Sequence, residues 1–359
     1  MNNIYSLIMA GGSGTRFWPR SREKKPKQFL SIFGNETLAQ SSINRFLPIT
    51  PKENIFVISK LVQKEEITRQ KLTINPQNII YEPTGKNTLP CIGLAALFIQ
   101  KIDQDGIIVV SPSDHLVENQ PLFRETIQTA CRVADEYNGI VTIGISPTFP
   151  STGYGYIRTE AEIDPYSEIK AFKVKHFVEK PDIETARQYC STGEYYWNSG
   201  IFVVKCSVLW DAIRKYTPDI FNSLTEIGKY IGTPQYNTIL SRIYNAIDGI
   251  SIDYAIMENA DNVYLVKGDF VWNDLGGWEQ VYELTEKDEF KNATVGEVLL
   301  EDTENSYVYS QNGIIALMGV KDMLVVQDGN ATLICKKDRS EEIKKIVEQL
   351  KMKGLFKYI

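Results

Sequence analysis

Short β-rich runs alternate with helical patterns over the first part of the chain, and this alternation restricts the fold more than any other sequence feature. The buried-strand patterns are Ile4–Met9, Asn54–Ser59, Asn78–Tyr81, Gly106–Val110 and Ile140–Ile145. Helical periodicity falls between them at Thr37–Phe46, Leu61–Lys71, Thr88–Lys101 and Pro121–Tyr137. The alternation predicts an α/β fold with a mostly parallel sheet covered by helices on both faces. Because ligands of such sheets bind beyond the carboxyl ends of strands, the residues after each strand are the first candidates for a site.

The pattern changes twice in the rest of the chain. Extended runs at Ala171–Val178 and Tyr195–Val204 are separated by helical patterns at Ile183–Cys190 and Cys206–Tyr216. Short β-like pieces follow at Val295–Leu300, Ser306–Ser310, Ile314–Met318, Met323–Gln327 and Ala331–Cys335, and then a polar helix at Ser340–Leu350. We therefore expect a large domain over residues 1–287 and a small β-rich domain, ending in a helix, over residues 288–359.

Composition excludes several classes of protein. The 359 residues carry 39 Lys and Arg against 45 Asp and Glu, so no overall basic field favours nucleic acid. The five cysteines and two histidines lack the spacing of a zinc site, and we expect most of the cysteines to be reduced core thiols. The first apolar run has no basic region before it, and the run Cys91–Ile99 is too short to span a membrane. These features predict a cytoplasmic protein.

A glycine-rich segment after the first strand is the densest chemical feature of the sequence. It reads Ala10-Gly11-Gly12-Ser13-Gly14-Thr15-Arg16, and Lys27 follows soon after. Glycines that accept positive φ let backbone N–H groups converge on one anion, which the Arg and Lys can neutralise. The segment is neither a Walker loop nor a complete dinucleotide fingerprint. An ordinary glycine turn with a solvated basic face is the alternative; Arg16 and Lys27 at this spacing favour a phosphate cradle.

This segment resembles the signature of the sugar-nucleotide pyrophosphorylase family, Gly-x-Gly-Thr-Arg followed by Pro-Lys. Seven further motifs occur in the order of that family: Glu82–Thr88, Pro112–His115, Gly153–Ile157, Phe177–Pro181, Trp197–Gly200, Ser251–Ala255 and Trp272–Trp278. Together they resemble the bacterial mannose-1-phosphate guanylyltransferases. The resemblance implies a Rossmann-like catalytic domain of the nucleotide-diphospho-sugar transferase type over residues 1–287 and a β-helix-like domain over residues 288–359.

The activity that this resemblance implies is the transfer of GMP from GTP to α-D-mannose 1-phosphate, with Mg²⁺ as cofactor. A sugar-phosphate oxygen attacks the α-phosphorus in line, GDP-mannose forms and pyrophosphate leaves. The expected partners are GTP and mannose 1-phosphate, with neither nucleic acid nor membrane, and a homodimer is left open. Another sugar 1-phosphate, such as a heptose, or another nucleotide is one alternative. A catalytically dead nucleotide-sensing relative is a second, against which the intact charged residues argue.

The resemblance also assigns residues to the nucleotide. The nucleotide-binding positions are Ala10, Gly11, Gly12, Ser13, Gly14, Thr15, Glu82, Asn87 and Thr88. Among them, Glu82, Asn87 and Thr88 correspond to base and ribose recognition. The residues in catalytic roles are Arg16 and Lys27 on the triphosphate and Lys180 on the incoming sugar phosphate.

The sugar-phosphate side is assigned in the same way to Gly155, Glu179, Lys180 and Asn198. Strand alternation by itself would point Glu179 and Lys180 to opposite sides just before Pro181, and a surface ion pair is the alternative interpretation. Asn198 interrupts an aromatic and apolar strand, so it is either a structural amide or a reader of sugar hydroxyls. We favour the reader.

Two carboxylates are candidates for the magnesium site. Asp114 follows the buried strand that ends at Val110, and Asp274 lies in an aromatic and glycine-rich turn. Mg²⁺ is commonly held by one or two carboxylates together with phosphate oxygens. A helix or turn cap for Asp114 and a turn-forming role for Asp274 are the alternatives. The neighbouring His115 is interpreted as structural, because a phosphate oxygen needs no general base.

Two positions depart from the family pattern. Position 86 is Lys where Arg is usual, which keeps the charge but loses the bidentate fork. Position 20 is Arg where an apolar residue is common. The chain also lacks the second, isomerase domain of longer relatives, so we expect one activity.

Overall fold

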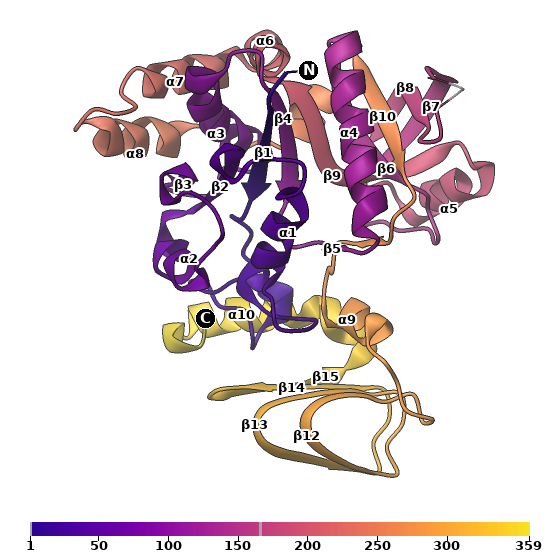
Figure 1. Cartoon of the computed structure of the whole chain (residues 1–359). Coiled ribbons are helices and arrows are strands. Elements are labelled where there is room, and N and C mark those ends of the chain that lie inside the picture. The colour runs from indigo at the N-terminus through magenta and orange to yellow at the C-terminus, as the bar shows by residue number, and fades with distance from the viewer. Residues whose placement is uncertain (1, 165–166) are drawn as a thin grey trace. The chain divides into compact units, whose positions relative to one another are not determined.

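The computed structural model describes residues 2–164 and 167–359, which fold into two compact units (Figure 1). The first unit consists of Met1–Gly11, Ser41–Lys64 and Leu72–Asn273. The second consists of Gly12–Gln40, Glu65–Lys71 and Asp274–Ile359. The glycine-rich segment therefore passes from one unit to the other between Gly11 and Gly12.

A nine-stranded sheet forms the centre of the first unit, in the order β3-β2-β1-β4-β9-β6-β10-β8-β7. Its strands are β1 (Ile4–Met9), β2 (Ile55–Lys60), β3 (Ile79–Glu82), β4 (Ile107–Pro112), β6 (Ile140–Ile145), β7 (Tyr156–Glu162), β8 (Ala171–Val178), β9 (Tyr195–Lys205) and β10 (Val263–Gly268). Strands β9 and β8 run antiparallel to their neighbours, and the other seven share one direction. The predicted mixed, mostly parallel α/β fold is confirmed.

Helices cover both faces of this sheet (Figure 1), so residues in its central strands are buried on both sides. On one face Leu7 of β1 and Ile108 of β4 pack against Ile92 and Leu94 of α3. Helix α4 packs over β4, β6, β9 and β10, and its buried residues, among them Phe123, lie outside that cluster. Each fully buried side chain of this kind stabilises the fold by about 1.5–3 kcal/mol.

The remaining elements of the first unit complete its framework. Its helices are α1 (Leu38–Phe46, begun in the second unit), α3 (Thr88–Ile102), α4 (Gln120–Tyr137), α5 (Ile183–Thr192), α6 (Cys206–Tyr216), α7 (Pro218–Gly228) and α8 (Tyr236–Ala246), whereas α2 (Lys64–Gln70) belongs to the second unit except for Lys64. A two-stranded ribbon joins β5 (Leu116–Val117) to β11 (Trp272–Asn273). A short π-helical turn covers Asp253–Met257. Within residues 2–164 and 167–359, no helix is long and apolar enough to cross a membrane.

The second unit contains a four-stranded sheet in the order β12-β13-β14-β15. Its elements are β12 (Ala293–Glu301), β13 (Tyr307–Met318), β14 (Met323–Asp328) and β15 (Ala331–Lys336), with helices α9 (Trp278–Leu284) and α10 (Ile343–Met352). The sequence predicted two separate pieces where the structure has the single strand β13. Between the two predicted pieces, the side chain of Gln327 accepts the backbone N–H groups of Gln311 and Asn312, at 3.2 and 3.3 Å, and the register with β12 shifts.

Candidate active site

The first residues of the glycine segment are held by the strands beside them. The N–H of Ala10 donates to the carbonyl of Ile58 at 2.7 Å, and its carbonyl accepts from the hydroxyl of Ser59 at 2.9 Å. A Cβ at Gly11 would lie 2.8 Å from Oε1 of Glu82. Glycine at this position therefore lets the predicted base-recognition carboxylate reach the predicted phosphate loop.

In the second unit, Gly14 has a left-handed backbone with φ of 57°, which disfavours any residue with a side chain. A Cβ there would also lie only 2.5 Å from Cβ of Lys27. Ser21 donates to the carbonyl of Gly14 at 2.6 Å, and Gln28 donates to the carbonyl of Gly12 at 3.2 Å. These bonds and the left-handed Gly14 fix the shape of the loop.

The two cations attached to this loop differ in environment. Arg16 is 44% exposed, and its Nε lies 2.7 Å from Oε2 of Glu341, which is 55% exposed. Lys27 is buried, and its Nζ donates to the backbone carbonyl of Asp274 at 2.6 Å. A hydrogen bond from a charged donor stabilises the fold by about 1.5–3 kcal/mol. Arg16 can therefore move to meet an anion, whereas Lys27 is already held by the protein.

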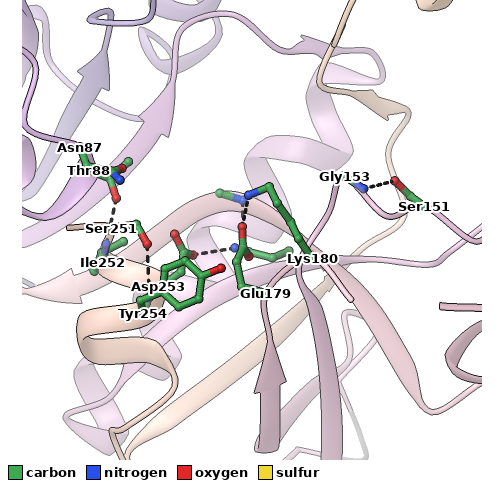
Figure 2. Close-up of polar contacts among 12 residues, drawn as sticks. Asn87, Thr88, Ser151, Gly153, Glu179, Lys180, Ser251, Ile252, Asp253 and Tyr254 are labelled. Carbon is green, nitrogen blue, oxygen red and sulfur yellow. Dashed lines mark hydrogen bonds and ion pairs between the residues drawn. The ribbon is translucent and has the colours of Figure 1, made fainter. Parts of the chain in front are cut away.

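Glu82 ends β3 and is buried, and the hydroxyl of Tyr244 donates to its Oε2 at 2.8 Å. Burial raises the pKa of Glu82, although the bond from Tyr244 and the charge of Lys60 oppose this. The Asn87 side chain caps helix α3 by accepting the N–H of Thr88 at 2.8 Å. The hydroxyl of Thr88 accepts the N–H of Ile252 at 2.9 Å (Figure 2). These contacts hold the segment in place, and its role in base and ribose recognition stays a prediction.

The four predicted sugar-side residues lie together in the first unit. A Cβ at Gly155 would lie 2.5 Å from Oε2 of Glu179 and 3.4 Å from Cβ of Asn198. The N–H of Asn198 donates to the carbonyl of Gly155 at 2.8 Å. Lys180 forms an ion pair with Glu179 (Figure 2). Glycine at position 155 is what allows this close approach.

Glu179 and Lys180 lie beyond the end of β8 at Val178, so strand alternation does not apply to them. Lys180 has a positive φ of 48°, which turns the chain where the sequence suggested opposite directions. The Glu179 side chain is 8% exposed and that of Lys180 is 56% exposed. The ion pair that the sequence analysis gave as the alternative interpretation is present, and the role of Lys180 on the sugar phosphate stays a prediction.

Asn198 is fixed by hydrogen bonds on both ends of its amide. Its Oδ1 accepts from the hydroxyl of Thr142 at 3.0 Å and from the N–H of Gly200 at 3.1 Å. Its Nδ2 donates to Oδ1 of Asp253 at 2.9 Å. The structural interpretation of Asn198 is supported by these contacts, and its role as a reader of sugar hydroxyls stays a prediction.

The sequence analysis places Asp253 in the family motif Ser251–Ala255 but assigns it no role. Burial raises its pKa from 3.8 to about 6, and the charge of Glu179 adds to the effect. The signal in the sequence was a carboxylate between the apolar residues Ile252 and Ala255.

The two predicted metal ligands belong to different units. Asp114, in the first, is 31% exposed, and its Oδ1 lies 3.8 Å from Nε2 of His115. The indole N–H of Trp272 donates to Nδ1 of His115 at 3.2 Å, which supports a structural role for the histidine. Asp274, in the second, is partly exposed. The joint role of Asp114 and Asp274 as magnesium ligands stays a prediction.

Both departures from the family pattern have structural partners. The Lys86 ammonium donates to the backbone carbonyl of Asn245 at 2.7 Å. The guanidinium of Arg20 lies 4.2 Å from the ring centroid of Tyr309 and donates to the carbonyl of Ser31 at 3.0 Å. Stacking on an aromatic ring suits Arg better than Lys. Arg20 therefore stabilises the second unit.

Comparison with known proteins gives the family. The family model described as nucleotidyl transferase matches residues 5–291. The chain belongs to the nucleotidyl transferase family. A second model, described as the MannoseP isomerase/GMP-like beta-helix domain, matches residues 296–350 of this nucleotidyl transferase, which confirms the β-helix-like C-terminal part.

Several known proteins are similar to this nucleotidyl transferase over nearly all of its length. The mannose-1-phosphate guanylyltransferase of Escherichia coli (strain K12) is 37% identical, over 98% of this chain and 74% of its own. The xanthan biosynthesis protein XanB of Xanthomonas campestris pv. campestris (strain B100) is 36% identical, over 99% and 74%. A crystal structure from Thermus thermophilus, described as a mannose-1-phosphate geranyltransferase, matches with a TM-score of 0.86 at 30% identity, covering 97% of this chain and 99% of that one.

Proposed function

We propose that this nucleotidyl transferase transfers GMP from GTP to α-D-mannose 1-phosphate, giving GDP-mannose and pyrophosphate. The contact of Gly155, Glu179 and Asn198 around one point, beside the exposed cation Lys180, is the observation that carries the proposal. A carboxylate and an amide suit sugar hydroxyls, and an ammonium suits a phosphate. Relatives named for this activity support the choice of mannose and guanine.

The chemistry requires the enzyme to bring two phosphate-bearing substrates together and to offset their repulsion. A sugar-phosphate oxygen attacks the α-phosphorus and pyrophosphate leaves from the opposite side, with no covalent enzyme intermediate. We assign Arg16 and the N–H groups from Gly11 to Thr15 to the triphosphate. Lys27 neutralises charge near the loop from its buried position. Lys180 would break its ion pair with Glu179 and bind the incoming sugar phosphate.

On the sugar side, Glu179 would then accept hydrogen bonds from the hydroxyl groups. Its low exposure makes this carboxylate stronger as an acceptor than one in open water. Gly155 leaves room for the Glu179 carboxylate, since any side chain there would collide with it. On the nucleotide side we assign Glu82, Asn87 and Thr88 to base and ribose.

We further propose that Asp114 and Asp274 hold Mg²⁺. Both supply carboxylate oxygens, the donors that Mg²⁺ prefers, and Asp114 is 31% exposed and so open to a hydrated ion. When bound, Mg²⁺ supplies positive charge to the phosphate oxygens.

We propose the cytoplasm as the place of action. All five cysteines are free, and Cys91, Cys131 and Cys206 are buried, which fits a reducing compartment. A homodimer stays open, and light scattering of the purified protein would decide it.

The test is pyrophosphate release over a grid of nucleoside triphosphates and sugar 1-phosphates. We expect GTP with mannose 1-phosphate to give the highest kcat/KM. A preference for UTP, dTTP or a heptose 1-phosphate would overturn the substrate assignment and keep the reaction class. No turnover with any pair, together with measurable GTP binding, would indicate a nucleotide-sensing protein instead.

A further inference from the structure

The motif Ser251–Ala255 has no role in the function proposed so far, yet its aspartate lies at the sugar side of the site. Asp253 begins the π-helical turn, and a single π-helical turn often marks a functional position. The residues on either side of it are held, since Ile252 donates to Thr88 and the N–H of Tyr254 donates to the hydroxyl of Ser251 at 3.3 Å (Figure 2). The carboxylate therefore has a defined place.

This carboxylate contacts residues from two other elements. Its Oδ1 accepts the 2.9 Å bond from Asn198 of β9. It also interacts electrostatically with Glu179 and Lys180, which follow β8. Asp253 is thus the partner of one predicted sugar-side residue and the neighbour of two others.

The bonds to Asp253 and to the N–H of Gly200 together determine which way the Asn198 amide points. An ionised carboxylate can only accept hydrogen bonds, so it selects the amide nitrogen. The amide oxygen then faces Thr142 and the N–H of Gly200, which both donate. A flipped amide would set its oxygen against the carboxylate and its nitrogen against the N–H of Gly200. Only one orientation satisfies all three partners.

We propose that Asp253 is a positioning residue of the sugar-phosphate site, which fixes the amide of Asn198 and thereby sets the affinity for the sugar 1-phosphate. This inference rests on the function proposed above. It differs from a purely structural role for Asp253, in which loss of the carboxylate would lower stability and affect both substrates alike.

The test compares three substitutions by saturation kinetics for each substrate and by melting curves. Asp253→Ala removes the acceptor, and we expect KM for mannose 1-phosphate to rise about tenfold while KM for GTP stays within about twofold. Asp253→Asn keeps an acceptor at the same place and should stay within about threefold of wild type. Asp253→Glu keeps the charge but moves it by one methylene, so it should resemble the Ala variant. Asp248→Ala, an exposed aspartate nearby, is the control.

A double-mutant cycle with Asn198→Ala tests whether Asp253 changes KM for the sugar phosphate through Asn198. If Asp253 acts through Asn198, the double variant should have the same KM for the sugar phosphate as Asn198→Ala alone. Additive effects, an unchanged KM in Asp253→Ala, or equal losses for both substrates would overturn the inference. If Asp253→Ala does not fold, the KM values of the other two variants for mannose 1-phosphate decide. A KM near wild type in Asp253→Glu, together with a raised KM in Asp253→Asn, would overturn the inference.

If the proposed substrate assignment is wrong, the experiments give a different result from the one expected if only the role of Asp253 is wrong. Wild-type protein would then prefer another sugar 1-phosphate, and the same variants would be measured with that substrate. A selective rise in its KM would support the role of Asp253 and reject only mannose. No turnover of any sugar 1-phosphate by the wild type would overturn both.

Discussion

Lys180 and Glu179 form an ion pair whose two side chains differ in exposure, 56% against 8%. A charge-assisted hydrogen bond to a phosphate contributes about 1.5–3 kcal/mol to binding, and removal of Lys180 also leaves the buried Glu179 carboxylate without its cation. The function of Lys180 is therefore separated from its contribution to folding by measuring substrate saturation and stability independently.

We expect Lys180→Met to lower kcat/KM for mannose 1-phosphate by roughly 10- to 150-fold, the kinetic equivalent of that phosphate bond. Affinity for GTP should change little, and the melting temperature should fall because the buried Glu179 carboxylate loses its cation. Lys175→Met, at an exposed lysine on β8, is the matched control. Separate saturation curves for the two substrates are the measurement, and an unchanged sugar-phosphate curve would show that Lys180 is only an ion-pair partner.

The second residue-scale prediction concerns the stability effect of Asp253. Its pKa is raised from 3.8 to about 6 by burial and by Glu179, with Lys180 opposing. The folded protein therefore binds this proton more tightly than the unfolded chain, and the free energy of unfolding falls as pH rises from about 4 to 6. Asp253→Asn avoids the ionisation and keeps the acceptor for Asn198.

We expect Asp253→Asn to be more stable than wild type at pH 8, by at most about 3 kcal/mol for a shift of this size. The gain should shrink towards zero near pH 4, where the wild-type carboxyl is protonated. Denaturant unfolding at the two pH values measures it, with Asp248→Asn as the control. An equal gain at both pH values, or a loss at pH 8, would contradict the assignment.

At the scale of elements, the segment before α10 competes for the cation of the phosphate loop. Arg16 lies in the 3-10 turn Thr15–Phe17, and Glu341 lies in the 3-10 turn Lys337–Glu342. The same part of the loop is tied to the C-terminus, since the indole of Trp18 donates to the carbonyl of Tyr358 at 2.8 Å. In the proposed function, a triphosphate would compete with the carboxylate of Glu341 for the guanidinium of Arg16.

Glu341→Gln should therefore lower KM for GTP by up to about fivefold, the range of an exposed ion pair. KM for mannose 1-phosphate should not change. Glu348→Gln, an exposed glutamate on α10, controls for the change in net charge. If KM for GTP rose instead, Glu341 would be holding Arg16 ready for the nucleotide.

At the scale of the whole molecule, Asp114 and Asp274 are the proposed magnesium ligands, and they lie far apart in the sequence. We expect Asp114→Asn and Asp274→Asn each to fold normally and to lose most Mg²⁺-dependent turnover, because a neutral amide does not balance the charge of the cation. Removal of Mg²⁺ by a chelator should abolish wild-type activity and readdition should restore it. Near-normal activity with an unchanged Mg²⁺ requirement in either variant would exclude that residue as a ligand.

Much of the fold could be predicted from the sequence because the signals are local. Buried strands such as β1 and β6 have continuous apolar runs, and α4 has the helical period, so each was placed to within about one residue. The glycine segment is also a local signal, because glycine accepts the left-handed backbone that Gly14 adopts. The family motifs also gave Gly155, Glu179 and Asn198, which the structure brings into contact.

Only the tertiary structure decided which elements and side chains are neighbours. Apolar periodicity shows which residues are buried but does not name their partners, so β9 lies between β4 and β6 although β7 and β8 come between β6 and β9 in the chain. The turn at Lys180 and the bond from Lys27 to Asp274 depend likewise on contacts that no local pattern encodes. Asn198 and Asp253 are 55 residues apart in sequence, and their hydrogen bond exists because the sheet and the π-helical turn bring them together.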